Sequence, residues 1–180
     1  RLIYFDTNSN VQSIGSESFK NCSHLKDINI PSSVVSISNE AFDNCTNITN
    51  VTLPANLESI GDNVFSGTSL TGSLTIPNNV TYIGSQPFGT GTSLSTINFD
   101  TNCKVTSIAE NFFTGFQNLT SVTLASDGSL NRIEQNAFLG AGRTDANTET
   151  AGSNLFTLTI PKTVTHIGHS AFKNSDISEV

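Results

Sequence analysis

One apolar pattern repeats along nearly the whole chain. A phenylalanine recurs every 23 to 25 residues, with one step of 34, and an isoleucine stands five positions before each phenylalanine. Two columns that keep the same spacing predict a solenoid, which is a stack of similar coils. The columns are Phe19, Phe42, Phe65, Phe88, Phe113, Phe138 and Phe172, and Ile14, Ile37, Ile60, Ile83, Ile108, Ile133 and Ile167. Residues 1–180 are therefore predicted to form a single array of about seven copies of 23–25 residues.

A further set of apolar columns predicts the strands. The last two residues of each set are two apart, as expected for a strand with one buried face. Such a strand cannot bury its apolar face alone, so we expect the coils to stack in parallel, each column against itself. The sets are Leu25, Ile28, Ile30; Ile48, Val51, Leu53; Leu70, Leu74, Ile76; Leu94, Ile97, Phe99; Leu119, Val122, Leu124; and Leu155, Leu158, Ile160, with Ile3 and Phe5 in the first strand.

Proline and glycine mark the turns of each copy. Pro31, Pro54, Pro77 and Pro161 cannot donate to a ladder and are predicted to mark strand ends. Gly15, Gly61, Gly84 and Gly168 follow the recurring isoleucine, which predicts a tight bend or a positive φ there. In the sixth copy, residues 140–154 form an insertion without aromatic or large apolar groups, predicted to be a mobile loop.

Several strings in the chain carry a resemblance to a known family. The strings SIGSESFKNCSHLKDINIPSSV, ESIGDNVF and THIGHSAF, and the Ile-Pro that ends INIP and LTIP, resemble the BspA-type (treponemal) leucine-rich repeats. The resemblance covers nearly all of the chain. It implies a mostly β, right-handed curved solenoid with a parallel sheet on the concave side and short strands and turns on the convex side. It also implies a secreted or surface protein of a bacterium or protist, often linked to adhesion.

Composition excludes several functions. The net charge of −7, with eight dispersed basic residues, argues against nucleic acid, because phosphate binding needs clustered Lys and Arg. No apolar run is long enough to insert into a bilayer. The chain has no Met and its last copy stops where a strand should begin, which indicates a fragment of a longer protein.

Catalytic and metal-binding constellations are not recognisable in the sequence. His166 and His169 form an H-x-x-H pair with Gly168 between them, but no Cys or acidic pair is near, so we predict neither a metal site nor a cofactor. The sequence shows no nucleophile elbow and no phosphate-binding glycine loop. We therefore predict that the segment is not an enzyme.

The three cysteines are predicted to be free thiols. Cys22 and Cys45 occupy equivalent positions in successive copies, so a disulfide between them is geometrically allowed. Buried free cysteines that act as small apolar residues are the preferred interpretation. Cys103 lies in a longer link and is expected to be partly exposed.

Two surfaces offer candidate binding residues. On the concave strands, the residues that alternate with the buried columns should face solvent and form a strip of small hydroxyl and amide groups, which we call the polar strip. Strand propensity and solubility are an equally good explanation of its composition. The polar strip comprises Asp27, Asn29, Asn50, Thr52, Ser73, Thr75, Thr96, Asn98, Ser121, Thr123, Thr157 and Thr159. On the convex side, the residue before the isoleucine is mostly serine but becomes Tyr82, Arg132 and His166, either as a contact surface or by neutral drift.

These features together predict a non-catalytic, extracellular or cell-surface module that binds a protein partner, such as a host, neighbouring-cell or matrix protein, in adhesion. Carbohydrate binding through the polar strip is an alternative, with Tyr4, Tyr82 and Phe156 as the available exposed aromatic residues. A structural spacer attached to another domain is a further alternative.

Overall fold

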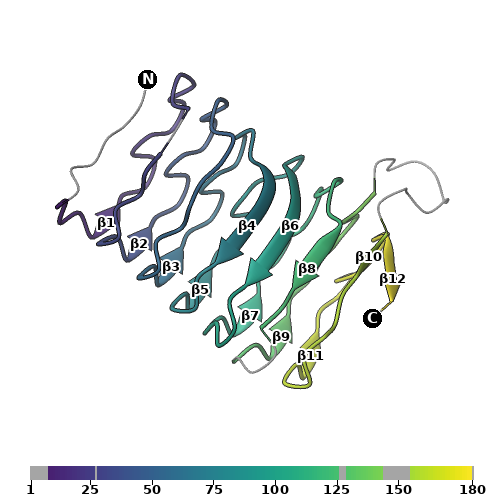
Figure 1. Cartoon of the computed structure of the whole chain (residues 1–180). Coiled ribbons are helices and arrows are strands. Elements are labelled where there is room, and N and C mark those ends of the chain that lie inside the picture. Colours follow the sequence, from purple (N-terminus) through teal and green to yellow (C-terminus); the bar gives the residue numbers. More distant parts are fainter. Residues whose placement is uncertain (1–7, 27, 126–128, 144–154, 180) are drawn as a thin grey trace.

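The protein is a stack of parallel coils. The structure, a computed structural model, describes residues 8–26, 28–125, 129–143 and 155–179. Figure 1 shows the coils side by side from the N-terminal end in purple to the C-terminal end in yellow. All ladder pairs in the described part are parallel, and none of these residues is helical. The prediction of a parallel-strand solenoid of about seven coils is confirmed.

Seven two-residue strands line one long side of the stack, where the recurring isoleucine pairs with its equivalent in the next coil, except between β5 and β7. They form two sheets, in the order β1-β2-β3-β5 and β7-β9-β11. We call this side the short-strand face. The strands are β1 (Ser13–Ile14), β2 (Ser36–Ile37), β3 (Ser59–Ile60), β5 (Tyr82–Ile83), β7 (Ser107–Ile108), β9 (Arg132–Ile133) and β11 (His166–Ile167).

The predicted longer strands form regular ladders only in the middle and at the C-terminal end of the array. They are β4 (Thr71–Ile76), β6 (Ser93–Phe99), β8 (Ser121–Thr123), β10 (Phe156–Thr157) and β12 (Ile177–Glu179), in the sheets β4-β6-β8 and β10-β12. We call this side the long-strand face. In the first two copies the prediction of a regular strand was wrong, because Ile28 makes only an isolated bridge and residues 48–53 make none. Their alternating burial is nevertheless kept, with Val51 and Leu53 buried on either side of exposed Thr52.

The strand of the sixth copy is shifted by one residue at its start. Leu155, predicted to be buried, is 53% exposed, and the adjacent Phe156 is buried instead. Phe156 donates its backbone N–H to the carbonyl of Asp176 and pairs with Ile177 of the next coil. Phe156 is therefore not an exposed aromatic residue, and that prediction was wrong. Of the predicted insertion at residues 140–154, residues 140–143 are described and include the buried Ala141, whereas 144–154 lie outside the described residues, as do Ile3 and Phe5.

The phenylalanine column forms an internal file of stacked rings. The centroids of Phe19, Phe42 and Phe65 follow one another at 5.1 and 5.4 Å, with ring planes within 5° of parallel. The file reaches Phe88 at 6.0 Å from Phe65, and a second stacked run joins Phe113, Phe138 and Phe172. Offset stacking at such distances adds to the burial of the rings themselves.

Left-handed residues on both sides of each phenylalanine build a third ladder. The residue two positions before the ring has φ between 47° and 58° in all seven copies, from Glu17 to Ser170. The residue two positions after it is an Asn or Gly with positive φ in six copies. In the first coil, the backbone N–H groups of Glu17, Phe19 and Asn21 donate to carbonyl oxygens of the second coil, at 2.8 to 3.1 Å. This turn therefore satisfies its donors through the following coil instead of within a helix.

The short-strand ladder is interrupted between the fourth and fifth coils. Strands β5 and β7 are not paired, although each pairs with its other neighbour. Phe112 occupies a column that elsewhere holds small residues such as Ala41 and Val64. Its ring lies 5.9 Å from Phe88 in an edge arrangement and 4.5 Å from Phe113, so it separates the two stacked runs. Seven phenylalanines in one unbroken file, as the spacing suggested, would have required a small residue at this position.

The recurring glycines are required for close approach between coils. Gly61, Gly84 and Gly168 do not have positive φ, so of the two predicted alternatives, a tight bend or a positive φ, the second does not apply. A Cβ on Gly84 would lie 2.7 Å from the backbone nitrogen of Asp62, and one on Gly168 would lie 2.5 Å from that of Gln135. Real Cβ atoms do not approach backbone so closely, which explains glycine at these positions.

All three cysteines are free thiols, as preferred from the sequence, and Cys45 is buried as predicted, but the exposure of Cys22 and Cys103 differs from the prediction. Cys22 is exposed, whereas Cys45 and Cys103 are buried. The thiol of Cys45 donates to the carbonyl of Phe19 at 3.0 Å, and that of Cys103 lies 3.5 Å from the carbonyl of Pro77. Cys103 is covered because the longer link folds it inward between two coils.

Candidate functional site

The polar strip lies on the long-strand face of the array. In β4 and in the strand of residues 156–159, exposed residues alternate with buried ones, so the side chains of Ser73, Thr75, Thr157 and Thr159 face solvent. Thr96 and Asn98, in the central strand β6, and Ser121, in the adjacent strand β8, are half-buried. Asn29, Asn50, Thr52 and Thr123 are also exposed. Asp27 lies outside the described residues.

Ladder register brings the central members of the polar strip together. Ser73 is opposite Thr96, Thr75 is opposite Asn98, and these continue to Ser121 and Thr123. The Nδ2 atom of Asn98 lies 3.4 Å from the hydroxyl of Ser73. The middle of the strip is thus a contiguous surface of short polar groups that both donate and accept hydrogen bonds.

A hollow of about 270 Å³ opens beside this surface. Its polar lining comes from Thr52, Ser73, Thr75 and Asp100, and Ala55 and Pro77 are among the apolar residues at its rim. The sequence interpretation missed Asp100. Its position was a usable signal, because it directly follows the buried Phe99 at the point where the previous copy has Pro77.

The three larger residues of the short-strand face do not form one surface. Arg132 and His166 are direct neighbours in the ladder of β9 and β11, whereas Tyr82 lies in the other short-strand sheet. The Nε atom of Arg132 donates to Glu134 at 2.6 Å. This hydrogen bond lowers the pKa of the Glu134 carboxyl and raises the pKa of the Arg132 guanidinium. Arg132 is therefore already engaged by a neighbouring carboxylate, while Tyr82 is 57% exposed.

The family profile of the BspA type leucine rich repeat region matches the sequence in six copies, over residues 1–105 and 72–180. The chain belongs to this BspA-type leucine-rich repeat family. A search of curated proteins found no match. The family fits a protein-binding module, and repeats of this kind are generally non-enzymatic.

Solved structures share the solenoid fold of the BspA-type array. A leucine rich cell surface protein from Faecalibacterium prausnitzii is 30% identical over 94% of this chain and 43% of its own, with a TM-score of 0.70. The leucine rich repeat protein of T. pallidum is 30% identical over 68% of this chain and 55% of its own, with a TM-score of 0.58. A leucine-rich repeat protein from Bacteroides ovatus, 21% identical with a TM-score of 0.63, shares the fold. The chain spans only about half of these proteins.

The described part of the BspA-type array contains neither a cluster of metal-ligating side chains nor a membrane-spanning helix. Among these residues, no three His, Cys, Asp or Glu side chains lie close enough together to hold a metal ion. Nor does any described helix have the length and apolar character needed to cross a bilayer.

Proposed function

We propose that this BspA-type array is a non-catalytic protein-binding module of the cell surface or extracellular space, which acts in adhesion by contacting a protein partner through the polar strip. The observation that carries the proposal is the contiguous surface formed by Ser73, Thr75, Thr96 and Asn98, with the hollow beside it. The name of the F. prausnitzii protein, a cell surface protein, supports the location.

The chemistry of the polar strip suits a broad contact of modest strength. Its side chains are short, so a partner backbone can approach closely and exchange hydrogen bonds with hydroxyl and amide groups. Asp100 is the single charged residue lining the hollow, which favours a partner that inserts a Lys or Arg side chain there. Hot spots are rich in Trp, Tyr and Arg, and the described strip has none of these. The anchoring side chains would then come from the partner, or affinity from several weak contacts.

Carbohydrate binding by the polar strip is less well supported. The aromatic residues considered as a platform for a sugar ring do not lie on this surface, because Phe156 is buried and Tyr82 is on the short-strand face. Tyr4 lies outside the described residues.

A charge-matched pair of variants tests the proposal. Asn50→Arg combined with Ser73→Arg places two long cations on the polar strip, where both native residues are exposed. The control, Ser13→Arg combined with Thr106→Arg, adds the same charge at exposed positions in or beside the short strands. Binding to immobilised extracellular-matrix proteins is measured by surface plasmon resonance, and folding by circular dichroism.

We expect the strip variant to bind at least about tenfold more weakly than the native array, since loss of one central contact commonly costs 1–2 kcal/mol or more. The control should bind like the native array. Native-level binding by a folded strip variant would exclude the polar strip, and equal losses in both variants would show a general charge effect.

A further inference from the structure

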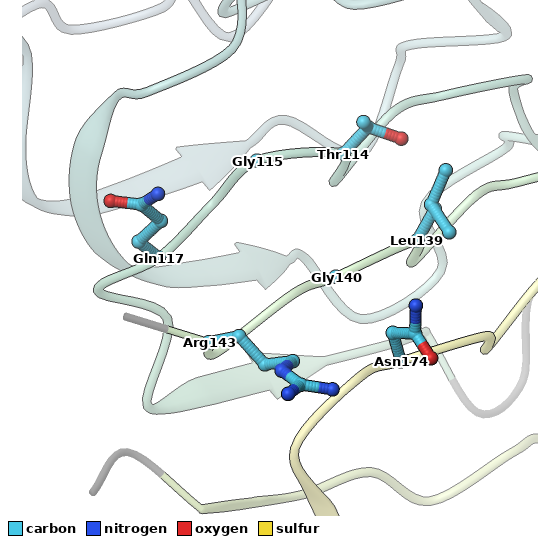
Figure 2. A pocket seen from close by; sticks show the side chains of 7 residues that line it. All are labelled: Thr114, Gly115, Gln117, Leu139, Gly140, Arg143 and Asn174. Carbon is cyan, nitrogen blue, oxygen red and sulfur yellow. The ribbon is translucent and has the colours of Figure 1, made fainter. Parts of the chain in front are cut away.

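A second pocket lies at the phenylalanine turns of the last three coils, away from the polar strip. It has a volume of about 270 Å³ and is lined by Thr114, Gly115, Gln117, Leu139, Gly140, Arg143 and Asn174. Figure 2 shows Leu139, Arg143 and Asn174 grouped around Gly140. The pocket is smaller than the roughly 300–1,000 Å³ of sites for drug-sized ligands, so it suits a ligand of about one sugar ring.

Loss of side chains from one column opens this pocket. The column two positions after each phenylalanine holds Asn21 and Asn44 in the first coils, but Gly115 and Gly140 in the fifth and sixth. A Cβ on Gly140 would meet no atom within 4 Å, so this glycine faces open space. Close packing between coils does not explain Gly140, in contrast to Gly84, where a Cβ would collide with the preceding coil.

Arg143 is the charged group of the pocket. Its Nε atom is buried and has no hydrogen-bond partner in the structure. Among the described residues Arg143 has no ion pair, whereas Lys20 is paired with Glu40 and Arg132 with Glu134. A buried donor without an acceptor is costly, and an anionic ligand in the pocket would supply the acceptor that Nε of this half-buried arginine lacks.

The remaining lining groups can complete a binding site. The side-chain amide of Asn174 makes no hydrogen bond with the described residues, so its donors and its acceptor are both available. The hydroxyl of Thr114 donates to the carbonyl of Asn136 at 3.0 Å and can still accept. Leu139 gives an apolar side.

We propose that this pocket binds an acidic monosaccharide of the uronic acid class, whose carboxylate pairs with Arg143. The sugar hydroxyls exchange hydrogen bonds with Asn174 and Thr114, and an apolar C–H face of the ring packs against Leu139. A guanidinium presents a fork of donors that matches a carboxylate. The proposal concerns a different surface from the polar strip and does not depend on adhesion through it.

The chemistry favours a sugar carboxylate over a peptide carboxylate. An acidic peptide side chain would pair with Arg143 but would bring no hydroxyl groups to Asn174 and Thr114. A neutral sugar would satisfy the amide and hydroxyl but leave the guanidinium without an anion. Only a ligand with both features uses all three residues.

Titration with D-glucuronate tests the proposal. Backbone amide shifts of Gly115, Gly140 and Gly142 are followed by nuclear magnetic resonance, with D-glucose and an N-acetylated glutamate amide as the two comparison ligands. We expect saturable shifts with glucuronate and none with glucose. Arg143→Gln should weaken glucuronate binding at least about tenfold, whereas Lys162→Gln, which removes the same charge at an exposed position, should change it less than twofold.

Gly140→Asn provides a variant that keeps the charge. It restores the residue of the equivalent positions Asn44 and Asn174, which have similar positive φ, so the coil should remain folded while the pocket is filled. We expect glucuronate binding to be lost.

Three outcomes would overturn the proposal. The first is unsaturated glucuronate shifts, or shifts unchanged by Arg143→Gln and Gly140→Asn. The second is binding of the glutamate amide without binding of glucuronate, which would assign the pocket to peptide. The third is glucuronate binding that appears only after Asp145→Asn with Glu149→Gln, which would identify a carboxylate of this chain as the natural occupant.

Discussion

The three thiols of this array differ in their access to solvent, and therefore in their chemistry. Burial raises the pKa of the Cys45 thiol to about 11 and also raises that of Cys103, because a thiolate is poorly solvated between coils. Cys22, in an equivalent position to Cys45 but near the N-terminal end of the described stack, is exposed. Since the thiolate is the reactive form, one column of the repeat holds both a reactive and an inert cysteine.

Alkylation with iodoacetamide at pH 8 should modify Cys22 and leave Cys45 and Cys103 intact in the folded protein. At that pH a thiol of pKa about 11 carries roughly 100-fold less thiolate than one at the ordinary 9.0. Mass spectrometry of proteolytic fragments gives the site of each adduct, and denatured protein is the control in which all three react. Rapid labelling of Cys45 in the native state would contradict the burial.

Cys45 also predicts a pH dependence of stability. Because its pKa is higher in the folded state, the unfolded chain loses this proton first, so the free energy of unfolding falls as pH rises from about 9 to about 11. Below about pH 9 the thiol is protonated in both states, so it does not change the free energy of unfolding as the pH varies. Urea unfolding at pH 8 and pH 10.5 measures the difference, which should be smaller in Cys45→Ala.

Left-handed residues show which backbone features the sequence could reveal. Two positions after the phenylalanine, residues such as Asn21 and Gly67 are types that adopt positive φ readily. The left-handed conformation of that column could therefore be predicted from the sequence. Two positions before it, Glu17, Glu40 and Gln86 have no such preference. Glu17 and Glu40 are held in this conformation by hydrogen bonds from their N–H groups to the next coil, which sequence inspection could not supply.

At the scale of the elements, close contact between successive turns fixes the glycine column. Gly61 and Gly84 each face the backbone of the preceding coil, and a Cβ on them would lie 2.6 Å from the nitrogen of Asn39 and 2.7 Å from that of Asp62. Gly15 stands in the same column, but a Cβ there would meet only the hydroxyl of Ser18 at 3.2 Å. The column thus contains both strict and permissive positions.

Replacing Gly84 by alanine should destabilise the array by about 1–3 kcal/mol, the usual cost of overpacking. Gly15→Ala should cost less than about 1 kcal/mol, because a serine side chain can rotate away. Denaturant unfolding followed by circular dichroism compares the two variants. Equal effects would show that glycine flexibility, and not contact between coils, explains the column.

Strand prediction succeeded in the middle of the array and failed in its first two copies. The alternating pattern correctly gave β4 and β6, and the prediction that Pro77 follows the end of a strand is confirmed. Ladders were missing in the first two copies, although the apolar residues were buried as expected. The members of the polar strip were assigned from that alternation, whereas Asp100 and the Arg143 pocket depend on how three coils fit together.

At the scale of the whole molecule, position along the stack decides what a core residue contributes. Ile60 is fully buried between two coils, but Ile167 in the last described short strand is 51% exposed. The same residue type in the same column therefore has two environments, as in other arrays where each coil contacts only its neighbours.

Ile60→Ala should lower the free energy of unfolding by about 2–5 kcal/mol, the range for truncation of a buried isoleucine. Ile167→Ala should cost less than about half as much, because much of that side chain is already in contact with water. Urea titration of the two variants gives the comparison. A larger loss for Ile167→Ala would contradict the stacking described for the last coil.

The third ladder gives the array a chemical direction. At the first coil its N–H groups donate toward the second, and at the sixth coil Phe138 and Gly140 donate toward the seventh. In the seventh coil the corresponding N–H groups of Phe172 and Asn174 have no acceptor among the described residues. Among the described residues, the last coil of this ladder therefore has N–H donors without an acceptor, and the first coil has carbonyl acceptors without a donor. Because the N–H groups of this turn donate toward the following coil, a further coil placed after the seventh would meet N–H donors, whereas one placed before the first would meet carbonyl acceptors.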